Sequence, residues 1–277
     1  MVAPDHEEPA VVAFWDSGCL GVQVLAEGRA RRLTLDAYFS VEADKRRLDE
    51  RLRRAFQRAG LGAGTRARLS PARARRWVES WQRTLRPITI GPFLVVPEGC
   101  RAPAARGRAV LRVRFGQAFG TGEHATTRLC LRLLSEHLVR NDRVVDLGTG
   151  SGILAMAALR LGASRVVAAD NDDVALEVAR ANLAANGLAG QIELRLADAS
   201  RACRPGPFDL ALVNIGASTI ERILPPLALA LAPGGRAILA GLLVEDEKQL
   251  LQAATRVGLV LEDKRRSRPW SALVLRR

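Results

Sequence analysis

The feature that most constrains this chain is a run of β-branched residues that leads directly into a cluster of glycines. The stretch VVDLGTGSG starts at Val144 and places glycines at 148, 150 and 152, and an apolar segment with helical spacing follows. A strand, a glycine loop and a helix in this order let the backbone approach a ligand closely and point free N–H groups at it. The loop therefore predicts a ligand site at the end of a buried strand.

From about residue 115 onward, segments typical of strands alternate with segments typical of helices. Strands are predicted near 143–147, 165–169, 191–196, 208–213 and 235–240, and helices near 126–140, 152–161, 173–186, 218–231 and 246–257. This alternation predicts an α/β fold with a doubly wound, mainly parallel sheet covered by helices on both faces. The final apolar stretches, GLVLEDKRR and SALVLRR, are close enough to pair as an antiparallel hairpin.

Residues 1–69 predict a small α+β domain. Short apolar runs separated by glycine turns over 11–35 indicate two or three strands. A helix should follow, because apolar residues recur at helical spacing and a glycine stands where that helix should end. These residues are Leu48, Leu52, Ala55, Phe56 and Gly60. The helix is expected to cover the small sheet.

Residues 70–86 predict a linker helix, and residues 87–277 the second domain. Ser70 can cap the linker helix, Pro71 suits its first turn, and the tryptophans at 77 and 81 are one turn apart. The second domain opens with ITIGPFLVVPEG and RAVLRVRF, which we expect to be the two strands of an entry hairpin.

Composition indicates a soluble, cytoplasmic protein without a metal site. No apolar stretch approaches the roughly 18 residues of a membrane span, and the opening MVAPDHEEPA is unlike a signal peptide. The cysteines lie far apart, in no metal-ligand spacing, and are expected to be reduced. They are Cys19, Cys100, Cys130 and Cys203.

The net charge of +13 is unevenly distributed, since residues 1–115 hold 22 Lys/Arg against 12 Asp/Glu and the remainder holds 20 against 17. One interpretation is contact between this basic half and an anionic surface such as ribosomal RNA. The other is a compositional bias, because 39 of the 42 basic residues are arginine. The sequence leaves both interpretations open.

Three aspartates should meet around the glycine loop. Asp146 precedes the first glycine, while Asp170 and Asp198 end the next two predicted strands. A buried carboxylate needs hydrogen-bond donors, disfavours a phosphate beside it, and at the second strand can accept both hydroxyls of a ribose. The loop, with Gly148 and Gly150, reads G-x-G-x-G rather than the dinucleotide pattern G-x-G-x-x-G. Together they predict a nucleoside ligand with a cationic tail and no phosphate, as in S-adenosyl-L-methionine, with Asp198 near the adenine.

The stretch QAFGTGEHATTRLCLRLL over 117–134, followed by the glycine loop, resembles the family of methyltransferases that modify large-subunit ribosomal protein eleven. LVNIGAS, WSALVLRR and the segment from Trp77 to Gly99 also resemble that family. The resemblance implies a class I methyltransferase, Rossmann-like fold that uses S-adenosyl-L-methionine. It further implies cofactor contacts at Thr127, Gly148, Asp170 and Asn214.

The leading hypothesis is a protein N-methyltransferase that acts on lysine or α-amino groups of that ribosomal protein, with the N-terminal domain holding the substrate. One rival is an rRNA methyltransferase, although the Asn-Pro-Pro-aromatic motif is missing after Asn214. The other is a ribosome-assembly factor with weakened catalysis, since Gly216-Ala217-Ser218 stands where the family usually has a bulkier pair. No general base can be named from the sequence, and we expect His124 to position other groups rather than to catalyse.

Overall fold

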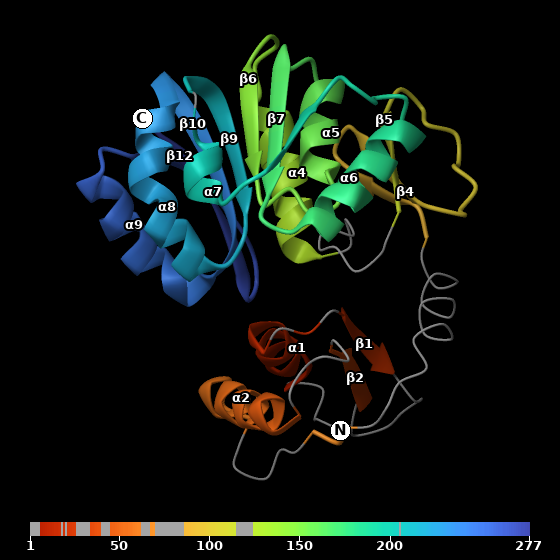
Figure 1. The fold of residues 1–277 in the computed structure, drawn as a ribbon, viewed down its shortest axis with the longest axis vertical. Helices are drawn as coiled ribbons and strands as arrows, with labels where there is room; N and C mark the ends of the chain where they lie inside the picture. The colour runs from red at the N-terminus through yellow and green to blue at the C-terminus, as the bar shows by residue number, and fades with distance from the viewer. Residues whose placement is uncertain are drawn as a thin grey trace. The chain divides into compact units, whose positions relative to one another are not determined.

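The computed structural model describes residues 6–17, 19, 21–25, 34–39, 45–61, 67–69, 86–114, 124–204 and 206–277. The backbone contacts divide the chain into two compact units, Met1–Thr84 and Leu85–Arg277 (Figure 1). Apart from Arg86, the predicted linker helix over 70–86 lies outside the described residues. Each unit is considered separately below.

The described part of the first unit holds two helices and a two-stranded antiparallel sheet. The elements are α1 (Glu7–Asp16), β1 (Gly21–Leu25), β2 (Thr34–Tyr38) and α2 (Lys45–Arg58). The inward face of α2 consists of the four apolar residues that the periodicity indicated, Leu48, Leu52, Ala55 and Phe56. The rings of Phe14 and Phe56 pack edge to face with their centroids 5.4 Å apart, which joins the two helices in one small core.

The prediction of strands across 11–35 is wrong at its start, where α1 is helical. The apolar run VVAFW looks like a strand because it is rich in β-branched and aromatic residues. The buried side chains nevertheless fall at Ala10, Ala13 and Phe14, which is helical spacing. Glu7 and Pro9 also suit the first turn of a helix.

The second unit contains the predicted doubly wound sheet, in the order β11-β12-β10-β9-β6-β7-β8. Its strands are β6 (Arg143–Leu147), β7 (Arg165–Asp170), β8 (Glu193–Leu196), β9 (Phe208–Asn214), β10 (Leu231–Leu243), β11 (Val260–Ser267) and β12 (Trp270–Arg276). Strands β8, β7, β6, β9 and β10 are parallel, and the predicted terminal hairpin β11–β12 adds two antiparallel strands.

Helices cover both faces of this sheet, as the alternation predicted (Figure 1). They are α4 (Ala125–His137), α5 (Ile153–Arg160), α6 (Asp173–Ala185), α7 (Ala199–Ala202), α8 (Ala217–Ala230) and α9 (Glu247–Arg256). Side chains such as Val145, Val213 and Leu239 pack with α8 and α9 in one continuous apolar core. The order of the strands reverses at β6, since β7 and β8 extend the sheet on one side and β9 and β10 on the other. Ligands of such folds bind at the carboxyl ends of the strands at this switch point.

A separate three-stranded sheet precedes the large one, and the predicted entry hairpin between ITIGPFLVVPEG and RAVLRVRF is wrong. Strands β3 (Ile88–Ile90) and β4 (Phe93–Pro97) form an antiparallel hairpin around Gly91-Pro92, and both lie within ITIGPFLVVPEG. Strand β5 (Ala109–Val113) then pairs parallel to β4 rather than as its hairpin partner. The parallel pairing requires a return connection, which residues 98–108 supply. Within the part of the chain that the structure describes, no helix is long and apolar enough to cross a membrane.

Candidate cofactor site

The glycine loop connects β6 to α5 in a conformation that only glycine adopts readily. Gly148 has a φ of +74°, and a Cβ placed on it would lie 2.4 Å from Cγ2 of Ile215. A side chain at this position would therefore clash with the segment that follows β9. The loop and the end of β9 pack against each other, so the predicted residues of the two strands lie at one edge of the sheet.

Asp146, in β6, is buried beneath the loop, with 1% of the residue exposed. Its Oδ2 accepts hydrogen bonds from Thr149 Oγ1 at 2.7 Å and from the Ala155 backbone N–H at 3.1 Å. Burial raises the pKa of Asp146 from 3.8 to about 7, and the nearby negative charge of Asp170 adds to the increase. Its Oδ1 has no hydrogen-bond partner among the described residues, so the carboxyl group can accept one more donor.

Asp170 ends β7 and contacts the glycine loop directly. Its Oδ2 accepts a hydrogen bond from the Gly150 N–H at 2.9 Å, and its Oδ1 accepts one from the Asp172 N–H at 3.2 Å. The cap of α6 is Asp172, whose side chain accepts from the Val174 N–H. Asp170 is therefore not the helix cap, and its partly exposed carboxylate stays beside the loop.

Asp198 caps the short helix α7. Its Oδ1 accepts hydrogen bonds from the Ser200 N–H at 2.9 Å and the Ser200 hydroxyl at 2.6 Å. These bonds lower the pKa of Asp198, and Arg222 lies 3.9 Å from its Oδ2. Capping engages only one carboxylate oxygen, so the contact with adenine stays a prediction.

Thr127 and Asn214 come together from α4 and β9. Both residues are buried, and Nδ2 of Asn214 donates a hydrogen bond of 3.4 Å to Oγ1 of Thr127. Oδ1 of Asn214, like Oδ1 of Asp146, is buried without a partner among the described residues. A buried acceptor without a donor is costly, so these two oxygens favour a ligand that brings N–H or O–H groups. The amine-bearing S-adenosylmethionine fits this requirement.

His124 caps α4 and is held as a neutral ring. Its Nδ1 lies 2.8 Å from Thr126 Oγ1 and accepts from the Thr126 N–H at 3.4 Å, so His124 and not Thr127 provides the cap. The ring packs against Trp270 with centroids 4.9 Å apart, and burial lowers its pKa to about 4. These contacts support the positioning role expected from the sequence.

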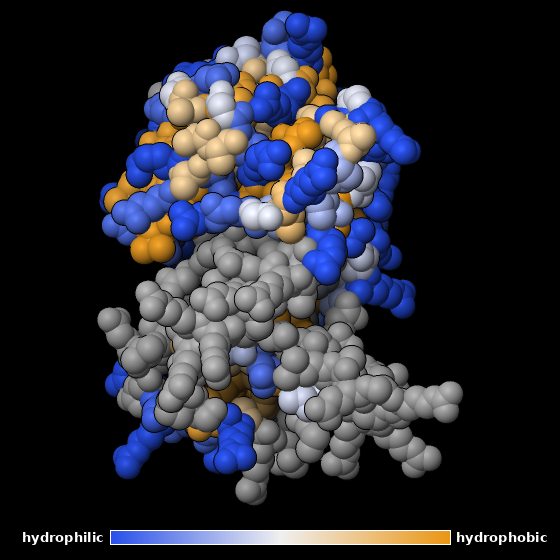
Figure 2. All heavy atoms as spheres, turned by 90° about the vertical axis from the view of Figure 1, so that its right-hand side faces the viewer, coloured by the Kyte–Doolittle hydropathy of each residue, from blue (hydrophilic) through white to orange (hydrophobic). Residues whose placement is uncertain are grey.

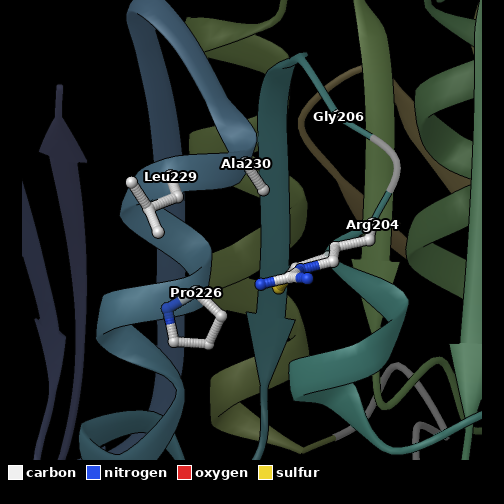
Figure 3. Close-up of a pocket in the computed structure, with 6 residues that line it drawn as sticks. Arg204, Gly206, Pro226, Leu229 and Ala230 are labelled. Carbon is white, nitrogen blue, oxygen red and sulfur yellow. The ribbon is translucent and has the colours of Figure 1, made fainter.

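A hollow of about 120 Å³ lies elsewhere, between α7 and α8 (Figure 3). Arg204, Pro226 and Leu229 are among the residues that line it, together with Gly206 just before β9. It is therefore near the amino-terminal end of β9, whereas Asn214 is at the carboxyl end. This hollow is separate from the site around the glycine loop.

Comparison with known proteins agrees with this geometry. The family described as ribosomal protein L11 methyltransferase (PrmA) matches residues 9–277. The chain belongs to this family. The L11 methyltransferase of Pelobacter propionicus is 42% identical over 258 residues, which cover 88% of this chain and 82% of that protein. That of Carboxydothermus hydrogenoformans is 32% identical over 265 residues, covering 95% and 85% of the two proteins.

A solved structure of the L11 methylase from Lactobacillus delbrueckii subsp. bulgaricus has the same fold. It matches with a TM-score of 0.61 at 32% identity and covers 66% of this chain and 92% of that chain. Membership in the L11 methyltransferase family, together with the two unpartnered oxygens, assigns S-adenosylmethionine as the cofactor. The fold class and the family indicated by the sequence are confirmed.

Two contacts of the L11 methyltransferase site were not foreseen. Thr149 donates a hydrogen bond to Asp146. The sequence held one signal for this contact, because Thr149 is a hydroxyl-bearing residue between two glycines of the loop. Trp270 packs on His124 from β12, and no local pattern connects those two residues. Gly216 and Ser218 belong to the segment that stands where the family usually has a bulkier pair. Both residues are exposed, and a Cβ on Gly216 would meet no atom within 4 Å. The space beside Asn214 therefore admits larger residues, and its effect on the substrate stays a prediction.

Proposed function

We propose that this chain transfers methyl groups from S-adenosylmethionine to lysine side chains, α-amino groups or both on ribosomal protein L11. Membership in the L11 methyltransferase family supports the protein substrate. The observation that carries the choice of an amine is the unpartnered Oδ1 of Asn214 at the end of β9. An oxygen acceptor at this place can hold an amine by its N–H groups and leave the nitrogen lone pair free.

The cofactor supplies an electrophilic methyl group on a sulfonium sulfur. The amine nitrogen forms the new C–N bond while the C–S bond breaks, so the protein chiefly has to align the amine with the methyl group. We assign cofactor binding to the residues expected from the sequence, namely Thr127, Asp146, Gly148, Gly150, Asp170, Asp198 and Asn214. Thr127 also orients Asn214, through the hydrogen bond between their side chains.

The amine must reach the site without its proton. A lysine with an ordinary pKa near 10.4 loses its proton at pH 7 at a cost of about 4.6 kcal/mol, unless burial and the nearby sulfonium lower that pKa. Asn214 and backbone carbonyls can accept hydrogen bonds from the neutral amine. His124, with a pKa of about 4, is a weak base at pH 7, so we give it a positioning role.

The test is a methylation assay with radiolabelled cofactor on purified L11, on ribosomal RNA and without substrate, followed by mass spectrometry of the modified peptides. Labelled L11 with methyl groups on lysine or the α-amino group is the expected result. Labelled RNA would support the nucleic-acid alternative. Cofactor binding without labelling of either would support the assembly-factor alternative.

We further propose that the L11 methyltransferase contacts an anionic surface such as ribosomal RNA through its basic N-terminal half. Residues 71–115 hold ten arginines against two glutamates, whereas residues 1–70 hold 12 basic against 10 acidic residues. Between residues 98 and 114 the arginines are Arg101, Arg106, Arg108, Arg112 and Arg114, and the only acidic residue is Glu98. Among the described residues, Arg114 alone of the five has a side-chain ion pair, with Glu98 at 3.2 Å.

Two of these arginines, Arg106 and Arg108, line a hollow of about 320 Å³ together with Thr89, Leu94 and Pro103. Figure 2 turns the side of unit 2 that carries β4 and β5 toward the viewer, and strongly hydrophilic side chains are numerous there. We expect the R106A/R108A variant to bind an RNA duplex more weakly and with a smaller salt dependence. Unchanged RNA binding would favour the compositional origin of the arginines.

A further inference from the structure

Helix α6 supports the glycine loop from behind. Gly152, the last glycine of the loop, has a φ of +77°, and a Cβ on it would lie 3.3 Å from Cβ of Ala179 in α6. Ala179 is fully buried, so loop and helix pack without an intervening side chain. The position of α6 therefore sets how far the loop can move back from its ligand.

Asn182, one turn after Ala179 on the same helix, joins the loop to a second segment. Its Nδ2 donates a hydrogen bond of 2.9 Å to the carbonyl of Ser151, inside the glycine loop. Its Oδ1 accepts a hydrogen bond of 2.6 Å from the N–H of Arg114, just after β5. The side chain is fully buried, and both of its polar atoms are satisfied.

Asn186 makes a matching contact one turn later but does not contact the loop. Its Oδ1 accepts from the Arg112 N–H at 2.8 Å, and its Nδ2 donates to the Arg112 carbonyl at 2.6 Å. The two asparagines thus bond to alternate residues along the edge of β5, in the way a neighbouring strand would. Of these two, Asn182 alone also bonds to Ser151, and this difference separates a role at the site from a role in holding β5.

We propose that Asn182 is a positioning residue for the cofactor, which fixes the Ser151 carbonyl and thereby the glycine loop in the binding conformation. The same amide joins this loop to Arg114, the last described residue before the 115–123 segment that carries FGTG in the sequence. The proposal rests on the assignment of the glycine loop to S-adenosylmethionine made above. Asn182 itself is behind the loop and acts through Ser151.

The experiment compares N182A with N186A in the full-length protein. Both variants should lose stability, because each frees backbone groups of β5. N182A should bind S-adenosylmethionine about tenfold more weakly by calorimetry, whereas N186A should bind within about twofold of the wild type. Hydrogen exchange should rise in a peptide spanning Gly148–Met156 in N182A and stay unchanged there in N186A.

The substitution N182D removes the bond to Ser151 and a longer contact of 3.5 Å from Nδ2 to the Arg114 carbonyl, both of which N182A removes as well. An aspartate keeps an acceptor for the Arg114 N–H, but its ionised second oxygen faces the Ser151 carbonyl without a donor. It should therefore weaken cofactor binding at least as much as N182A does. If N182D binds like the wild type while N182A does not, the bond to Arg114 is the important one and the proposal is wrong.

The wild-type titration separates this proposal from the assignment of the site. Wild-type protein that binds no S-adenosylmethionine would contradict the cofactor site itself. Wild-type binding together with equal affinities for N182A and N186A would contradict only the role of Asn182. Loss of affinity and loop protection confined to N182A and N182D would support it.

Discussion

Nδ2 of Asn214 donates to Oγ1 of Thr127, a residue 87 positions earlier in the chain, across 3.4 Å. This bond determines how the Asn214 amide is oriented, because it uses the NH₂ group and leaves Oδ1 as the free acceptor. The orientation suits an amine substrate, which brings N–H donors. Thr127 therefore helps to position the substrate amine, because it orients Asn214. This role adds to the cofactor contact that the family resemblance implies.

We expect N214A to lower kcat for methylation of L11 by about 100-fold, because the acceptor that aligns the amine is lost. The Kd for S-adenosylmethionine should rise by a much smaller factor, about threefold, since Asn214 is only one of several cofactor contacts. T127V keeps the side-chain volume and removes only the orienting hydroxyl, so its kcat should fall less. Steady-state kinetics and calorimetry on the three proteins test this, and an N214A variant with wild-type kcat would disprove the role of Asn214.

The D170A variant should raise the Kd for S-adenosylmethionine by about 10- to 100-fold, through the loss of charge-assisted bonds to the ribose. The matched control is D172A, since Asp172 caps α6 but does not contact the loop. D172A should lose about 1 kcal/mol of unfolding free energy and keep its cofactor affinity. NAD should not bind to any of these proteins, because Asp146 disfavours a pyrophosphate. Tight NAD binding would contradict the site assignment.

Cofactor affinity should increase with pH around neutrality. The pKa of Asp146 is raised to about 7 in the folded protein, so the neutral form predominates below that pH. This shift stabilises the cofactor-free protein below the unfolded pKa of about 3.8, and the contribution is lost as pH rises through 7. A cationic ligand prefers the ionised carboxylate. The Kd for S-adenosylmethionine should therefore fall between pH 6 and pH 8, measured by calorimetry, and the dependence should be weaker in D146N.

The parts of the site that sequence could predict are those that depend on short stretches of chain. A strand followed by a glycine loop requires only neighbouring residues, and so the positions of Asp146, Gly148 and Asp170 followed from the alternation of strands and helices. Asn214 and Thr127 were reached through the family resemblance.

Apart from the bond between Thr149 and Asp146, the contacts that were missed depend on partners far apart in sequence. Asn182 and Asn186 look like ordinary residues of an exposed helix face until β5 is placed beside them. The parallel pairing of β5 with β4 could not be distinguished from a hairpin, because both arrangements need the same apolar pattern. The helix α1 was missed because β-branched residues gave a strand-like run whose tertiary packing is helical.

Glu247 is a buried acid that connects α9 to the terminal hairpin, and its substitution should destabilise the protein without affecting the site. It accepts hydrogen bonds from Arg266, from Ser271 Oγ at 2.6 Å and from Lys264 Nζ at 3.2 Å. The bond to Arg266 is the main cause that lowers the pKa of Glu247 from 4.5 to about 2. This stabilisation is complete above pH 4.5 and is lost as pH falls through about 2.

E247Q should therefore reduce the free energy of unfolding by about 2 kcal/mol at pH 7, measured with urea. The difference between E247Q and the wild type should shrink as the pH is lowered toward 3. E245Q is the control, because Glu245 is an exposed acid near the same helix and should change stability by less than about 0.5 kcal/mol. Equal stability of E247Q and the wild type at pH 7 would show that the network contributes nothing.

The last prediction concerns the N-terminal unit, whose role in holding the substrate is still a proposal. A fragment that begins at Ser70 should fold, because the unit Leu85–Arg277 has its own buried core. Its Kd for S-adenosylmethionine should stay within about twofold of the full chain, since the glycine loop, Asp146 and Asn214 all belong to that unit. Methylation of L11 should nevertheless be lost, because a protein substrate must be held in line with the methyl group and the N-terminal unit would be absent. Full methylation by the fragment would rule out a recognition role.

In the full chain, activity that falls with rising ionic strength would point to steering of an anionic partner by basic residues, including Arg46, Arg47, Arg51, Arg53 and Arg54 of α2. Activity that is insensitive to salt would favour the compositional origin of these arginines.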